Sequence, residues 1–150
     1  MKLRVLASIL VLSASLAGAA QPASPKVDFT QLQDAASFRL LGQPELEKLA
    51  ANSMGAFAAP GALWTPTDVL SSKPLPRRRL IWVAQSNVLR VMHYEQGGFA
   101  HTYHVSVGEM DGTTYKPTWY ASTPRLRDYS DFLRVLNAGD VNPQPLPAGY

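Results

Sequence analysis

The sequence predicts an α+β fold: a four-stranded antiparallel meander over about residues 79–121, covered by a C-terminal helix, with a helical and loop-containing N-terminal region. Four short apolar or alternating runs follow one another in this stretch, and turn residues separate them. A stripe of apolar residues at helical spacing comes next, formed by Leu126, Tyr129, Phe132, Leu133 and Leu136. The part before the meander, residues 29–76, carries short helical signals between alanine- and glycine-rich stretches.

The strands of the meander are predicted from these runs, which are Arg79–Gln85, Val88–Glu95, Phe99–Gly108 and Thr113–Ala121. The loops between them are predicted to be short and rich in turn residues, namely Ser86-Asn87, Gln96-Gly97-Gly98 and Met110-Asp111-Gly112. Alternation along these strands then places one set of apolar side chains on a single face: Leu80, Trp82, Leu89, Val91, Tyr103, Val105, Val107, Tyr115 and Trp119. Pro117 cannot donate a ladder hydrogen bond, which places the fourth strand at an edge.

The helices are predicted from their start and stop residues. A short helix is expected over Gln43–Ala50, and a second over Thr65–Leu70, because each begins with a proline near its first turn. The C-terminal helix is expected to start at Thr123-Pro124 and to stop at Gly139. Residues 140–150 contain three prolines and are predicted to form a flexible tail.

The N-terminus has the pattern of a secretory leader. A positively charged start is followed by the apolar run Val5–Leu16 and by Ala17 and Ala19, which fit an A-x-A cleavage site. The apolar run is shorter than the ~20 residues that span a bilayer. We therefore expect residues 1–19 to be removed near Ala19 by the general secretory route, and 20–28 to form a linker. The product is predicted to be periplasmic or secreted, without a membrane anchor.

Composition limits the classes of function. The chain has 150 residues and no cysteine, so residues 29–139 are expected to form one domain without disulfides, thiol catalysis or cysteine–zinc sites. Without Lys2 and Arg4 the 14 basic residues fall to 12 against 11 acidic ones, a net charge of +1. This balance gives no reason to expect a nucleic acid or an anionic lipid as partner.

A metal site is one hypothesis. With the predicted three-residue loop, His93 and His101 lie opposite each other on one face and can supply two imidazole ligands. His104 alternates to the other face, so a third ligand has to come from elsewhere, for example from Glu95 or Asp111. The alternative is two ordinary histidines at the end of a hairpin.

The other candidate sites in the sequence are a catalytic site and a basic run. The motifs G-x-S-x-G, S-x-x-K and H-E-x-x-H are absent, so no catalytic residue is assigned. Glu95 and Glu109, near hairpin turns, are interpreted either as a carboxylate pair for glycoside cleavage or as ordinary surface glutamates. The basic run Arg77, Arg78 and Arg79 is interpreted either as a site for phosphate, lipid A or an acidic protein, or as a solvated strand entrance.

The second face of the meander has two interpretations. Its first two strands carry the apolar residues Ile81, Val83, Val88 and Met92 beside Arg90 and Tyr94. This patch is either a surface that binds another protein, or it is covered by the N-terminal region in a three-layer domain.

The favoured hypothesis for function is a small exported cell-envelope protein that acts by protein–protein contact. Its most specific form is an inhibitor or immunity-type protein against an envelope-targeting enzyme. The predicted contact residues are Arg90, Tyr94, Glu95, Phe99 and His104. Alternatives are a small-molecule or metal-binding module that uses His93 and His101, a hydrolase of unrecognised type, and a component of a secretion or surface assembly. No cofactor is predicted.

Overall fold

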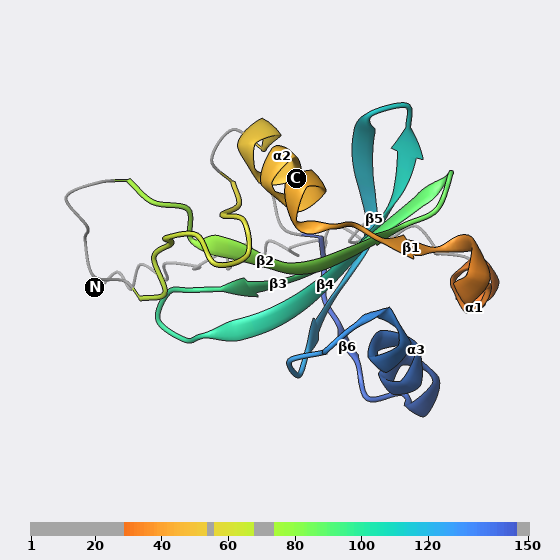
Figure 1. Cartoon of the computed structure of the whole chain (residues 1–150). Coiled ribbons are helices and arrows are strands. Elements are labelled where there is room, and N and C mark those ends of the chain that lie inside the picture. Colours follow the sequence, from red (N-terminus) through yellow and green to blue (C-terminus); the bar gives the residue numbers. More distant parts are fainter. Residues whose placement is uncertain (1–28, 54–55, 68–73, 147–150) are drawn as a thin grey trace, which may run out of the picture.

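The computed structural model of the chain describes residues 29–53, 56–67 and 74–146. It has an α+β fold with an antiparallel sheet and a C-terminal helix, as predicted (Figure 1). The elements in chain order are α1 (Phe29–Gln33), the 3-10 helix η1 (Ala35–Ser37), β1 (Arg39–Leu40), α2 (Gln43–Asn52), β2 (Arg78–Gln85), β3 (Leu89–Gln96), β4 (Thr102–Asp111), β5 (Thr114–Thr123), α3 (Tyr129–Ala138) and β6 (Asn142–Pro143). The predicted leader and linker lie outside the described residues.

The sheet is a meander of six strands in the order β1 to β6, not of four as predicted. The four central strands correspond to the predicted ones, and a two-residue strand is added at each edge. Arg39–Leu40 pairs with the end of β2, and Asn142–Pro143 pairs with Ser122 and Ala121 in β5. The second pairing places part of the predicted flexible tail on the sheet, where the Gln144 N–H donates to the Tyr120 carbonyl (2.9 Å).

Helices pack on both faces of the sheet, so the domain has three layers. Figure 1 shows α3 on one side of the central strands and α2 on the other. The core under α3 is made of these buried side chains: Leu32, Trp82, Ala84, Leu89, Val91, Val105, Val107, Leu126, Tyr129, Phe132 and Val135. The core under α2 is made of Leu46, Ala50, Leu80, Val83, Met92, Tyr94 and Tyr120. The second face is therefore covered by the N-terminal region, one of the two interpretations that the sequence left open.

Two bulges change which side chains share a face. The pairing of β2 with β3 shifts between Leu80 and Trp82, and the pairing of β4 with β5 shifts between Val107 and Gly108. One extra residue reverses the alternation beyond it. Leu80 and Tyr115 therefore pack on the α2 side, and their predicted places on the α3 side are wrong. Pro117, which has no N–H to donate, lies opposite Gly108 at the second bulge.

The helix α2 begins where the sequence predicts it, at Gln43 after Gly42. The Glu45 side chain accepts from the Gly42 N–H (3.0 Å) and binds both terminal nitrogens of Arg39 (2.8 and 2.9 Å). These contacts satisfy one free N–H of the first turn and hold β1 to the helix. The helix predicted over Thr65–Leu70 is not seen at Thr65 to Thr67, and its other residues lie outside the described chain.

The helix α3 begins at Tyr129, five residues after Pro124, the predicted first helical residue. The Asp128 side chain accepts from the Asp131 N–H (2.9 Å), so Asp128 and not Thr123 is the N-cap. The end at Gly139 was predicted correctly, and its left-handed backbone (φ 75°) is a conformation that favours glycine. Within the described ranges, no helix is long and apolar enough to cross a membrane.

Candidate functional site

A cluster of polar and aromatic side chains lies where β2, β3 and β4 meet the β3–β4 loop. It consists of Trp64, Arg79, Glu95, His101 and Tyr103, and we call it the Glu95 cluster. The Glu95 carboxylate binds Arg79 Nε through one oxygen (2.5 Å) and His101 Nε2 through the other (2.7 Å). Arg79 also lies 4.9 Å from the centre of the Trp64 ring. His101 is in ring contact with Trp64 and Tyr103.

The sheet register explains why these residues meet. Arg79 is the cross-strand neighbour of Glu95, and Glu95 is the neighbour of Tyr103 on the next strand. Side chains opposite each other in an antiparallel pair have Cβ atoms about 5 Å apart, which is within ion-pair reach. Trp64 arrives from a distant segment that is held by the Thr65 N–H bond to the Pro76 carbonyl (2.9 Å). The Glu95 side chain is only 7% exposed, so its two partners satisfy a buried charge.

The β3–β4 loop, residues 97–101, lies next to this cluster and contributes His101 to it. Its first residues are fixed by backbone hydrogen bonds from the Gly97 N–H to the Arg77 carbonyl (2.8 Å) and from the Gly98 N–H to the Pro66 carbonyl (3.3 Å). A Cβ atom on residue 97 would lie 2.3 Å from the Thr65 carbonyl oxygen, so only glycine permits this approach. The other end of the loop is held through His101. Between these points, Phe99 is fully exposed (102%).

The predicted contact residues are divided between this site and the interior. Phe99 lies on the surface and Glu95 lies beneath it. Tyr94 and His104 are buried (0 and 6% exposed) under α2 and the segment that follows it, so neither is available to a partner at the surface. Arg90 is also buried, at the opposite end of β3. Sequence reasoning missed Trp64, because its place depends on how residues 56–67 pair with Arg79 and Gly98 through isolated bridges.

The three consecutive arginines do not form one cluster. Arg79 binds Glu95, whereas the Arg78 guanidinium lies over the rings of Phe57 and Tyr94 (5.8 and 5.9 Å) and donates to Gln96. Arg77 is exposed. Because successive side chains of a strand point to opposite faces, the guanidinium groups of Arg78 and Arg79 cannot converge on a single phosphate.

The predicted histidine pair is not formed. The β3–β4 loop has five residues and not three, so His93 is paired with Val105 and His101 lies in the loop. Among residues 29–53, 56–67 and 74–146, no group of three histidine, aspartate or glutamate side chains is placed to hold a metal ion. The cross-strand geometry on which the metal hypothesis rested is therefore wrong.

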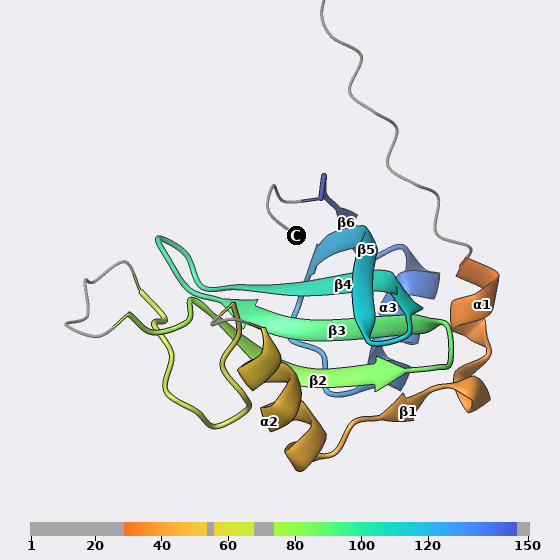
Figure 2. The ribbon, with the colours of Figure 1, turned by 90° about the horizontal axis from the view of Figure 1, so that it is seen from above.

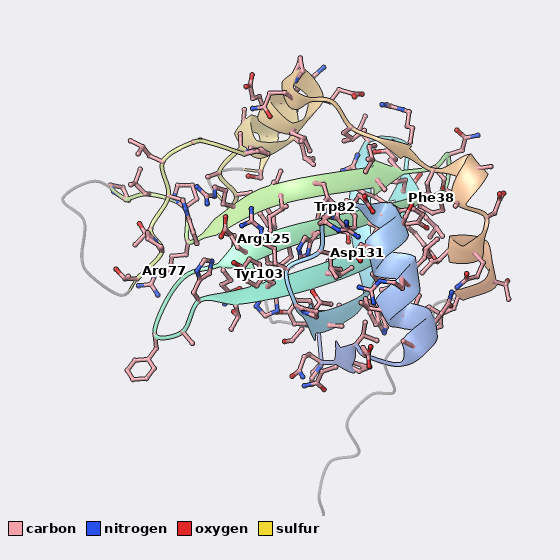
Figure 3. All side chains as sticks on the ribbon, turned by 60° about the horizontal axis from the view of Figure 1, so that its bottom comes forward. Phe38, Arg77, Trp82, Tyr103, Arg125 and Asp131 are labelled. Carbon is pink, nitrogen blue, oxygen red and sulfur yellow. The ribbon has the colours of Figure 1, made fainter. Side chains whose placement is uncertain are left out.

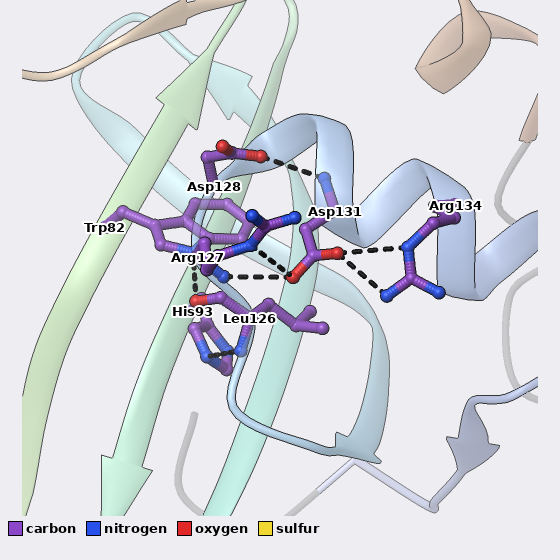
Figure 4. Close-up of polar contacts among 7 residues, drawn as sticks. All are labelled: Trp82, His93, Leu126, Arg127, Asp128, Asp131 and Arg134. Atoms are coloured by element: carbon purple, nitrogen blue, oxygen red, sulfur yellow. Dashed lines mark hydrogen bonds and ion pairs between the residues drawn. The ribbon is translucent and has the colours of Figure 1, made fainter.

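His93 instead fixes the segment that leads into α3 (Figure 4). Its Nε2 accepts from the Leu126 N–H (3.0 Å), and its Nδ1 lies 3.0 Å from the His104 carbonyl oxygen. A backbone N–H can only donate, so Nε2 carries no proton and Nδ1 is the donor. Trp82 Nε1 donates to the Leu126 carbonyl (3.1 Å). The backbone N–H and carbonyl of Leu126 are thus both bonded to side chains of the sheet. Burial lowers the pKa of His93 to about 4.

His104 is held in a similar way on the other face of the sheet. Its Nδ1 lies 2.7 Å from the Tyr120 hydroxyl and its Nε2 lies 2.8 Å from the Thr102 hydroxyl. The ring is stacked on that of Tyr120. Burial, with a smaller contribution from the charge of Arg78, lowers the pKa of His104 to about 4. Both histidines are therefore neutral at pH 7 and act as structural hydrogen-bonding groups.

Comparisons of the chain with protein-family models, with curated proteins and with solved structures gave no significant match. The function therefore has to be inferred from the geometry of the chain itself.

Proposed function

We propose that this protein binds another protein through the β3–β4 loop, with Phe99 as the anchor. The observation that carries the proposal is the full exposure of Phe99 on a loop whose two ends are fixed. A large aromatic side chain that is fully exposed to water would gain favourable free energy if a partner buried it. Aromatic residues are also common at the energetic centres of protein interfaces.

The fixed base of the loop favours tight binding. A flexible loop loses conformational entropy when a partner orders it, which weakens the complex. Here the Gly97 and Gly98 backbone bonds and the His101–Glu95 bond already order both ends of the loop. A partner then has to order little more than the Phe99 side chain itself.

The charges near the loop indicate the chemistry of the partner. Arg125 is exposed, and it lies toward the end of the sheet opposite Phe38 (Figure 3). The carboxylate of Glu95 is buried and already bound by Arg79 and His101, so it does not offset the charge of Arg125 at the surface. The partner surface that fits is an apolar pocket, large enough for a phenyl ring, with acidic residues at its rim.

The biological form of this proposal is an exported protein of the cell envelope, with residues 1–19 as the leader. A protruding loop on a rigid sheet is suited to enter the cleft of an enzyme. We therefore propose an inhibitor or immunity-type role against an enzyme that acts on the envelope.

Site-specific photo-crosslinking in the producing cells tests the proposal. A photoreactive phenylalanine analogue at position 99 is expected to give one discrete adduct, which mass spectrometry identifies. The matched control is the same analogue at Val88, which is 57% exposed in the β2–β3 loop at the other end of β3. Phe99→Ala is then expected to weaken binding of the identified partner by about tenfold or more. The same adducts from both positions, or none from position 99, would overturn the proposal.

A further inference from the structure

A separate groove lies on the other face of the sheet, between α2 and the β4–β5 hairpin. We call it the α2 groove. Figures 1 and 2 show α2 and the end of this hairpin on the same side of the central strands. The cavity has a volume of about 670 Å³, within the range of about 300–1,000 Å³ that is usual for sites of small ligands.

Arg90 lies in the wall of this groove and is 9% exposed. Its Nε donates to Gln85 Oε1 (2.9 Å), and its guanidinium carbon lies 5.8 Å from the centre of the Tyr115 ring. Within the described part of the chain, no carboxylate lies within ion-pair distance of Arg90 and no hydrogen bond is made by its two terminal nitrogens. Burial lowers the pKa of this guanidinium, which reflects the cost of holding its charge away from water.

The guanidinium of Arg90 has lost much of its hydration, and an anion bound at its terminal nitrogens would compensate that loss. The other arginine of the groove differs, since Arg39 is paired with Glu45. The terminal nitrogens of Arg90 are two parallel donors, and one carboxylate can accept from both. A phosphate dianion would need a second cation at the same depth, whereas Lys48, the remaining cation of the groove, is exposed.

The rest of the groove is largely apolar. The side chains of this kind that line it are Leu41, Leu49, Phe57, Met92, Met110 and Tyr115. Methionine side chains are flexible and adapt to unbranched chains of different length. The groove therefore combines one deep anion site with an apolar surface beside it.

We propose that the α2 groove binds a small amphiphilic carboxylate of the medium-chain fatty acid class. The carboxylate accepts from the two terminal nitrogens of Arg90, and the hydrocarbon chain lies along the methionine and leucine side chains. The assignment is independent of the Phe99 loop, which lies at the other end of β3.

Calorimetric titration of the folded protein with three probes tests the charge and the chain separately. Decanoate carries both features, acetate carries only the carboxylate, and decyltrimethylammonium carries the chain with the opposite charge. Below the micellar concentration, decanoate is expected to bind at least about tenfold more tightly than either of the other two. Equal binding of decanoate and decyltrimethylammonium, or no binding of decanoate, would contradict the proposal.

Variants locate the site. Arg90→Met is expected to weaken decanoate binding about tenfold or more, while thermal unfolding shows an unchanged or higher melting temperature, because the unpaired charge is removed. Lys48→Gln, at the exposed rim, is the matched control and is expected to change the affinity less than about threefold. Arg90→Lys, which keeps the charge without the paired donors, serves if Arg90→Met does not fold, and it is also expected to weaken binding.

A spectroscopic readout distinguishes the groove from any other apolar site. With labelled methionine methyl groups, decanoate is expected to shift the signals of Met92 and Met110 in the native protein. Full decanoate affinity in Arg90→Met, or binding that leaves both methyl signals in place, would show that the ligand lies elsewhere.

Discussion

Buried polar side chains connect the parts of this fold. Glu95 joins β2 to the β3–β4 loop, and His93 joins the sheet to the segment before α3. In each case one side chain uses two polar atoms for two different elements. Such residues are sensitive to substitution, since the loss of one partner leaves the other buried without a hydrogen bond.

Glu95→Gln tests this at the Glu95 cluster. The amide keeps the shape of the side chain but loses the charge, so the bonds to Arg79 and His101 are weakened together. We expect a loss of about 1–3 kcal/mol in the free energy of unfolding, measured by urea denaturation at pH 7. His101→Ala removes only one of the two bonds, at a half-exposed side chain, and is expected to cost less than Glu95→Gln. A larger loss for His101→Ala would mean that ring contacts, and not the carboxylate, hold the loop.

The candidate site could be predicted from the sequence only in part. Phe99 and Glu95 were identified because a glycine-rich turn between two strands marks a hairpin end. The prediction of the histidine pair was wrong because the loop has five residues. The Gly97 N–H donates to the Arg77 carbonyl and the Gly98 N–H to the Pro66 carbonyl, so these glycines do not close a tight turn. A cross-strand pair depends on the register, and the register depended here on a segment far away in the sequence. The α2 groove depends in the same way on how α2 packs against the sheet.

Elements were predicted better than the contacts between them. The four central strands, α2 and the end of α3 follow from periodicity and from proline and glycine positions. The two-residue strands β1 and β6 have no sequence signal of their own, since two residues cannot show alternation. The start of α3 was misplaced because the cap signal of Thr123-Pro124 competes with that of Asp128. Tertiary bonds to Leu126 keep residues 124–127 out of the helix.

Asp128→Ala tests the observed start of α3. The aspartate side chain accepts from the Asp131 N–H, which has no partner within the helix. Its loss is expected to reduce the free energy of unfolding by about 1 kcal/mol. Ser130→Ala, in the same turn but exposed, is the matched control and is expected to stay within about 0.5 kcal/mol of the native protein. Equal effects of the two variants would place the N-cap elsewhere.

The whole molecule carries its proposed binding sites on opposite faces and at opposite ends of the sheet. Strand β3 has eight residues, so the Phe99 loop and Arg90 are separated by roughly 20 Å of extended chain. The central strands between them are covered on both sides by the two cores. The sheet thus acts as a rigid support, and both sites occur where the covering layers end.

The two buried histidines make the stability of the whole fold dependent on pH. Their pKa values fall from 6.5 in the unfolded chain to about 4 in the folded protein. The unfolded chain therefore binds more protons between these values, and the free energy of unfolding decreases as the pH falls from about 6.5 to about 4. Above pH 6.5 both forms are neutral and the contribution is complete.

Two carboxyl groups with lowered pKa values affect stability at lower pH. Hydrogen bonds from Arg39 and Arg134 hold the pKa values of Glu45 and Asp131 at about 2, so their contribution to stability is lost as the pH falls from about 4.5 to about 2. The interval from pH 6.5 to 4.5 therefore reports mainly on His93 and His104.

Urea denaturation at several pH values checks this assignment. The free energy of unfolding of the native protein is expected to fall by several kcal/mol between pH 7 and 4.5, since each shift of about 2.5 units is worth roughly 3 kcal/mol when fully developed. His93→Gln offers a neutral donor and acceptor to the same partners, and it is expected to remove about half of the pH dependence while remaining folded. An unchanged slope in this variant would mean that His93 is not the group that becomes protonated on unfolding.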